Sequence, residues 1–72
     1  MQKTNSAELD SFSQGVLYAA SLLVAIHDQP TMAASILREA DLNEADCSAL
    51  DDFEKRNLRR IQGEKAIALR GL

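Results

Sequence analysis

The most reactive side chains in this 72-residue sequence belong to one histidine, His27, and one cysteine, Cys47. A cysteine acts as a nucleophile when a neighbouring base takes its proton and a third group orients that base. Both residues fall near expected helix ends, so the two side chains could meet. The simpler interpretation is a histidine favoured by a helix C-terminus and a small buried thiol. We therefore expect no catalytic residue and no enzymatic activity.

Metal and cofactor sites are not predicted by any motif in the chain. A structural zinc ion takes about four ligands, and His27 and Cys47 are the only His and Cys present. The acidic stretch 41–46 lacks the alternating oxygen ligands and the fixed glycine of a calcium loop. A phosphate-binding loop needs clustered glycines, and the three here stand alone at Gly15, Gly63 and Gly71.

Charge is divided unevenly along the chain. Residues 1–53 carry nine acids and two bases, a net −7, whereas residues 54–72 carry two acids and six bases, a net +4. The basic residues of the second part that share one helical stripe are Lys55, Arg56, Arg59 and Arg60. Arginine pairs well with carboxylates and equally well with phosphates. We expect this stripe to bind an acidic surface on a partner protein or on a second copy, with nucleic acid as the alternative target.

A DNA-binding interpretation must also be weighed for residues 36–50. Apolar and small residues recur there with the rhythm of a helix-turn-helix. However, Asp41 occupies the turn position where glycine is usual, and acids such as Glu44 and Asp46 would face the phosphates of DNA. Ordinary packing of two short helices is the simpler interpretation, and a small DNA-binding or transcription-modulating protein is kept as the alternative function.

The elements that would position these residues are helices. The chain has one proline and three glycines, which argues against a turn-rich, strand-rich fold, and its 46% hydrophobic and 26% charged residues are typical of a globular domain. We predict one all-α domain over residues 1–72, with helices at about 8–27, 30–40 and 48–62. A domain this small is marginally stable alone, and without a disulfide or metal the usual remedy is self-association.

The first predicted helix offers a surface for that association. Asn5 with Glu8 has the spacing of a capping box, and Ser6 is an alternative cap. The apolar positions that follow cover an arc of roughly 180°, wider than the stripe of an ordinary surface helix. We expect this helix to pack on its own chain and on a second copy, making a homodimer. The residues assigned to the dimer contact are Phe12, Val16, Leu22, Leu23 and Ile26.

The other two helices have start and stop signals. Pro30 suits the first turn of the second helix, whose predicted core face is Met32, Ala33, Ile36, Leu37 and Ala40. Ser48 with Asp51 repeats the capping spacing, and Gly63 is expected to end the third helix. The predicted core face of that helix is Leu50, Phe53, Leu58 and Ile61. Leu42 is expected to enter the core, and the tail 64–72 is interpreted as an arm on a neighbour or as disordered.

No membrane segment or signal peptide is expected. The apolar run 16–26 is shorter than the roughly 20 residues that span a bilayer. It is preceded by Glu8 and Asp10, which is the wrong charge for a signal peptide. A lone cysteine fits a reducing compartment, so we expect a soluble cytoplasmic protein.

Parts of the sequence resemble a known group of proteins. The stretches HDQPTMAASILREADL and CSALDDFEKRNLRRIQGE, within residues 18–66, are similar to small uncharacterised accessory proteins of lambdoid phages and enterobacterial prophages. The resemblance implies a small protein that binds and redirects one host protein, and it transfers no site residues. Together with the residue patterns it favours a non-enzymatic protein–protein interaction module.

Overall fold

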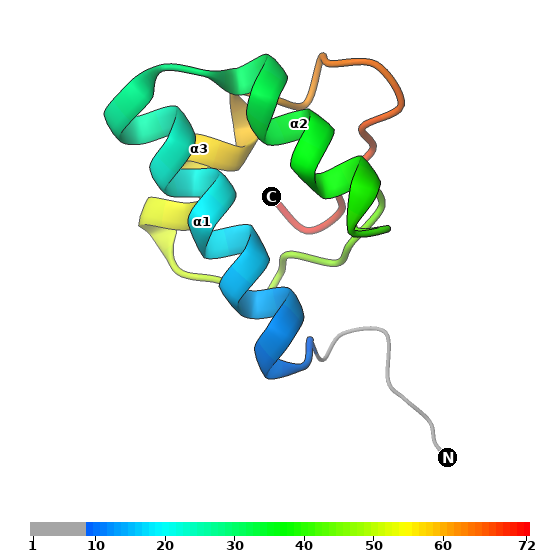
Figure 1. Ribbon diagram of the computed structural model, residues 1–72. Helices are drawn as coiled ribbons and strands as arrows, with labels where there is room; N and C mark the ends of the chain where they lie inside the picture. Colours follow the sequence, from blue (N-terminus) through cyan, green and yellow to red (C-terminus); the bar gives the residue numbers. More distant parts are fainter. Residues whose placement is uncertain (1–8) are drawn as a thin grey trace.

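A computed structural model describes residues 9–72 and contains three helices in that range (Figure 1). They are α1, Ser11–His27, α2, Pro30–Glu39, and α3, Asp52–Arg59. Helix α1 packs against both α2 and α3, and Figure 1 shows it lying across α3 with α2 at its side. No strand is present among the described residues. The predicted all-α, three-helix fold is confirmed.

Helix α1 begins later than predicted. Asp10 is its N-cap, and one carboxylate oxygen accepts a hydrogen bond from the backbone N–H of Ser13 at 2.7 Å. Leu9 and Asp10 are not helical, so the helix cannot start at residue 8. The predicted caps Asn5 and Ser6, with Glu8, lie outside the described residues. Asp10 was the better cap because its side chain reaches the third residue of the helix that follows.

The C-terminus of α1 is closed by Asp28 in the left-handed conformation, with φ 52°. The N–H groups of Asp28 and Gln29 donate to the carbonyls of Val24 and Leu23, at 3.0 and 3.3 Å. This pair of bonds satisfies two of the carbonyls that a helix end leaves free. Pro30 then begins α2 at its first position, as predicted.

The inward face of α2 matches the prediction in part, because Ala33 and Leu37 are core members and Ala40 packs against the core. Ala33, Ala34 and Leu37 are fully buried, but Met32 is 56% exposed and Ile36 40% exposed. Two adjacent alanines make a flat surface on which α1 can approach closely, so the alanine side of α2 faces the core. The larger side chains of Met32 and Ile36 remain in solvent.

Helix α3 is shorter than predicted at both ends. Asp51 is the N-cap, and its carboxylate accepts a hydrogen bond from Glu54 N–H at 2.8 Å. The predicted cap Ser48 lies in a turn, where its own N–H donates to the Asp46 carboxylate. Helical bonding ends after Arg59, and Gly63 lies beyond the helix without the positive φ of a helix-ending glycine. Phe53 was assigned to the core but is 36% exposed.

The C-terminal segment packs on its own chain, so both interpretations offered for the tail were wrong. Residues 66–70 run parallel to residues 43–47 and form a short bridge between Asp46 and Arg70. The N–H of Ala68 donates to Asn43 O at 2.8 Å, and Cys47 N–H donates to Arg70 O at 2.7 Å. This pairing holds the alternating apolar residues of the tail against the helices.

A single hydrophobic core joins the helices to this segment. Its buried members are Leu17, Ala20, Val24, Ala33, Ala34, Leu37, Leu42, Cys47, Leu58, Ile61, Ile67 and Leu69. Leu42 enters the core as predicted, and Ile67 and Leu69 come from the tail. The core therefore needs residues from both ends of the described chain.

Candidate interaction surfaces

The predicted basic stripe is partly committed to the fold. Arg60 forms an ion pair with Asp28, and its Nη1 donates to Val24 O at 3.5 Å, so it clamps the end of α1. Arg59 donates from Nη2 to Leu72 O at 3.0 Å and holds the tail. Lys55 and Arg56 make no hydrogen bond or ion pair with the described residues. Among the described residues, the stripe is thus divided into two arginines that hold the fold and two cations without a partner.

Most arginines of this protein donate a hydrogen bond to a backbone carbonyl. Arg38 donates to Lys65 O at 2.8 Å, and Arg70 donates from Nε to Glu44 O at 3.1 Å. With Arg59 and Arg60, four of the five arginines bind a backbone carbonyl of the chain. Arg56 is the exception, because no group within residues 9–72 accepts a hydrogen bond from its guanidinium.

Two partly exposed aromatic rings contact each other where α1 meets α3. Tyr18 of α1 and Phe53 of α3 have ring centroids 6.4 Å apart and ring planes inclined by 49°. Tyr18 is 49% exposed. Phe53 and Arg56 are three residues apart on α3, which places them on neighbouring positions of one face. We call Tyr18, Phe53 and Arg56 the aromatic patch. The sequence pattern missed it because Phe53 fits the core periodicity of α3 equally well.

The residues predicted for self-association occupy two different environments on α1. Phe12 and Ile26 are 70% and 67% exposed. Leu22 is partly buried. Val16 and Leu23 are also partly buried, and they pack against the core cluster of the same chain. The structure therefore places three of the five on the outer face of the helix and two at the edge of the core.

His27 and Cys47 have no shared chemistry in this structure. The Cys47 thiol is buried and lies 3.7 Å from Ala45 O. Burial, followed by the nearby Asp46 and Glu54 carboxylates, raises the pKa of Cys47 to about 11. A thiol with that pKa stays protonated at neutral pH and is a poor nucleophile. His27 is exposed at the end of α1, and no hydrogen bond joins the two among the residues described.

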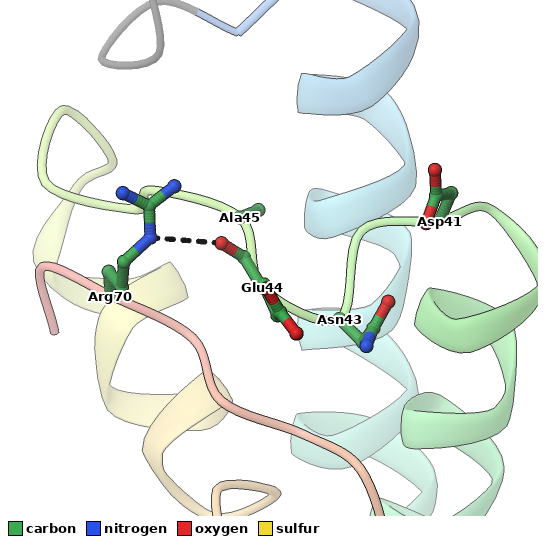
Figure 2. A pocket seen from close by; sticks show the side chains of 5 residues that line it. All are labelled: Asp41, Asn43, Glu44, Ala45 and Arg70. Carbon is green, nitrogen blue, oxygen red and sulfur yellow. Dashed lines mark hydrogen bonds between the residues drawn. The ribbon is translucent and has the colours of Figure 1, made fainter.

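A shallow hollow of about 350 Å³ lies where the tail meets the α2–α3 connection (Figure 2). Its lining residues are Asp41, Asn43, Glu44, Ala45 and Arg70. The polar groups are used by the fold, because Asn43 donates to Ala66 O at 3.0 Å and Arg70 binds the Glu44 carbonyl. Within residues 9–72 no group of three or more His, Cys, Asp or Glu side chains is placed to hold a metal ion.

The helix-turn-helix that was weighed for residues 36–50 is not formed, and neither is the second of the two short helices preferred in its place. Helix α2 ends at Glu39 and α3 begins at Asp52, so the would-be recognition segment consists of turns and the bridge at Asp46. The short-range bonds of this connection, such as Ser48 N–H to the Asp46 carboxylate, replace helical hydrogen bonds. An alternative DNA-binding function would have to use the basic side chains of α3.

Comparison with known proteins does not assign a function to this chain. None of the described helices combines the length and the apolar character needed to cross a membrane. Comparison of the chain with protein-family models, with curated proteins and with solved structures found no match.

Proposed function

We propose that this chain is a non-enzymatic, cytoplasmic interaction module that binds and modulates one host protein, as a phage or prophage accessory protein does. The observation that carries the proposal is the aromatic patch. Arg56, which has no partner among residues 9–72, lies one helical turn after Phe53, whose ring centroid is 6.4 Å from that of Tyr18 on α1. Tyrosine and arginine are among the residues most enriched at the energetic centres of protein interfaces.

The chemistry of the patch specifies the kind of partner. Its aromatic rings offer flat apolar area with few rotatable bonds, so little conformational entropy is lost when they are covered. The Arg56 guanidinium can form two parallel hydrogen bonds to one carboxylate. The partner we propose is therefore a folded protein that presents an acidic side chain next to an apolar surface.

The test compares two charge reversals of equal size. We capture proteins from host lysate separately with the purified wild type, with Arg56→Glu and with Lys65→Glu. Any host protein that the wild type retains is then purified and titrated with all three. Lys65 is an exposed cation outside the patch, so its reversal is the matched control. We expect Arg56→Glu to weaken binding about tenfold or more, which is about 1.4 kcal/mol, and Lys65→Glu to leave binding unchanged.

The second arm of the experiment separates the alternative function. The same three proteins are titrated with duplex DNA at about 50 mM and 200 mM salt, because phosphate contacts are strongly weakened by salt. Salt-sensitive DNA binding that Arg56→Glu abolishes, with no host protein captured, would replace our proposal with the DNA-binding one. Equal capture of the host protein by all three chains would show that the aromatic patch is not the binding surface.

A further inference from the structure

The outer face of α1 carries an apolar seam of five residues. Phe12, Gly15, Ala19, Leu22 and Ile26 are separated by steps of three, four, three and four residues. This spacing keeps side chains along one line of a helix, as in the contact seam of a coiled coil. The seam lies opposite the buried residues of α1, which are Leu17, Ala20, Ser21 and Val24. All seam residues except the partly buried Leu22 are exposed.

The seam lies on a helix that carries no carboxylate, lysine or arginine. Over Ser11–His27 the only titratable side chains are Tyr18 and His27, although 26% of the whole chain is charged. An exposed helix face is normally polar or charged, and burying an unpaired charge is costly. A charged partner would find no complement on this face. A second copy of the same face brings no charge and can be covered without that cost.

We infer that α1 pairs antiparallel with α1 of a second copy, with small residues of one seam facing large residues of the other. When Ala19 faces Leu22 of the other copy, the two-fold symmetry also places Gly15 opposite Ile26. The same contacts repeat on the other side of the axis, as required for a symmetric dimer. Gly15 has open space where a Cβ would stand, so that position can receive a large side chain.

The available area supports a dimer of modest affinity. Phe12, at 70% exposure, and Ile26, at 67%, supply most of the apolar surface. With their neighbours they offer roughly 500 Å² per copy, which gives an interface near the ~1,000 Å² lower limit for specific association. An interface of this size is typical of weak, reversible association.

The experiment exchanges the sizes of two facing residues. Sedimentation equilibrium is run from about 1 to 100 µM, a range that brackets a micromolar dissociation constant, on the wild type, Ala19→Leu, Leu22→Ala and the double variant. We expect the wild-type mass to rise towards twice 7.9 kDa. Each single change should weaken association about tenfold or more, whereas the double change, which exchanges the two sizes, should restore it.

One control variant outside the seam and one further variant within it complete the experiment. Ala25→Leu adds the same side chain at an exposed position of α1 outside the seam and should leave association unchanged. Ile26→Gln, also at an exposed position, should weaken association without disturbing the core. Circular dichroism confirms that each variant keeps its helix content. A wild type that stays monomeric throughout, or a double variant no better than the singles, would overturn the proposed pairing.

Discussion

The two halves of this domain satisfy their backbones in different ways. Residues 11–39 are almost entirely helical, and their polar backbone groups are bonded within α1 and α2 or by the turn at Asp28. Residues 40–72 contain one eight-residue helix, and side chains from distant positions bind much of the remaining backbone. Examples are Asn43 on Ala66 O and Arg59 on Leu72 O. Buried backbone groups need partners in either case.

Gln62 shows how one side chain can replace a neighbouring strand. Its Nε2 donates to Leu69 O, and its Oε1 accepts from Leu69 N–H, both at 2.9 Å. The amide group thus offers Leu69 the donor and acceptor that an adjacent strand would supply. The comparison teaches that a short chain can fold a segment without regular structure into its core when amide and guanidinium groups are placed at the right positions.

The largest effect should come from removing the apolar anchors of the second half. Changing Ile67 and Leu69 together to serine removes two side chains that are 8% and 5% exposed. Each loss costs about 2–5 kcal/mol, and the sum reaches the whole stability of an average small domain. We expect the cooperative thermal transition to disappear, α1 and α2 included. Ala68→Ser, at the exposed position between them, is the control. Survival of α1 and α2 as a folded unit would show that the two halves are independent.

A smaller loss should follow from adding one methyl group at Gly71. This glycine has φ +76°, and a Cβ there would lie 2.6 Å from Ser48 N and 2.8 Å from the Asp46 carboxylate. The positive φ and the short distances to the added Cβ together predict that Gly71→Ala loses about 3 kcal/mol of stability. Gly63→Ala, where nothing lies within 4 Å, should have little effect on chemical denaturation. Equal midpoints for the two variants would show that the tail can move away from the 46–48 turn at no cost.

The buried thiol of the second half predicts a loss of stability at high pH. The pKa of Cys47 is raised from 9.0 to about 11, chiefly by burial. The thiol of the unfolded chain therefore releases its proton at lower pH than the folded one, and stability falls as the pH rises from 9 towards 11. The expected loss is about 2 kcal/mol. Urea unfolding of the wild type and of Cys47→Ala across this pH range isolates the contribution of the thiol. The same change of unfolding free energy with pH in both proteins would contradict the prediction.

The smallest predicted change has the opposite sign. Ala66 adopts φ 64° in the turn before the tail, a conformation that costs a residue with a Cβ about 1 kcal/mol or more relative to glycine. Ala66→Gly should therefore stabilise the protein by about 1 kcal/mol. Ala68→Gly, at a residue without positive φ, should destabilise it slightly. A melting temperature that falls for both would mean that flexibility of the unfolded chain outweighs the relieved strain.

The first half was the easier to predict from sequence because its signals are local. Pro30 marks the start of α2, and the apolar periodicity of residues 9–26 defines α1. What local patterns could not supply was the inward face of α2. Met32 and Ile36 fit the helical period, but the choice between large and small residues at the contact depends on how closely α1 approaches. That distance is a tertiary property.

The second half was predicted poorly because its contacts join distant residues. A four-residue cap spacing at Ser48 and Asp51 looks like a helix start, but the Asp46 carboxylate holds Ser48 in a turn. The basic stripe was visible as charge alone. Which of its arginines hold the fold depends on where the Asp28 carboxylate and the Leu72 carbonyl lie in space. No spacing rule for α3 contains that information.

The contribution of Ile67 and Leu69 to the core also sets an order of events during synthesis. Synthesis runs from the N-terminus, so α1 and α2 are made before Ile67 and Leu69, which belong to the same core. Closure also needs the long-range pairing of 43–47 with 66–70, which forms more slowly than local helix contacts. We therefore expect the pairing of 43–47 with 66–70 to complete the core after the local contacts of α1 and α2 have formed.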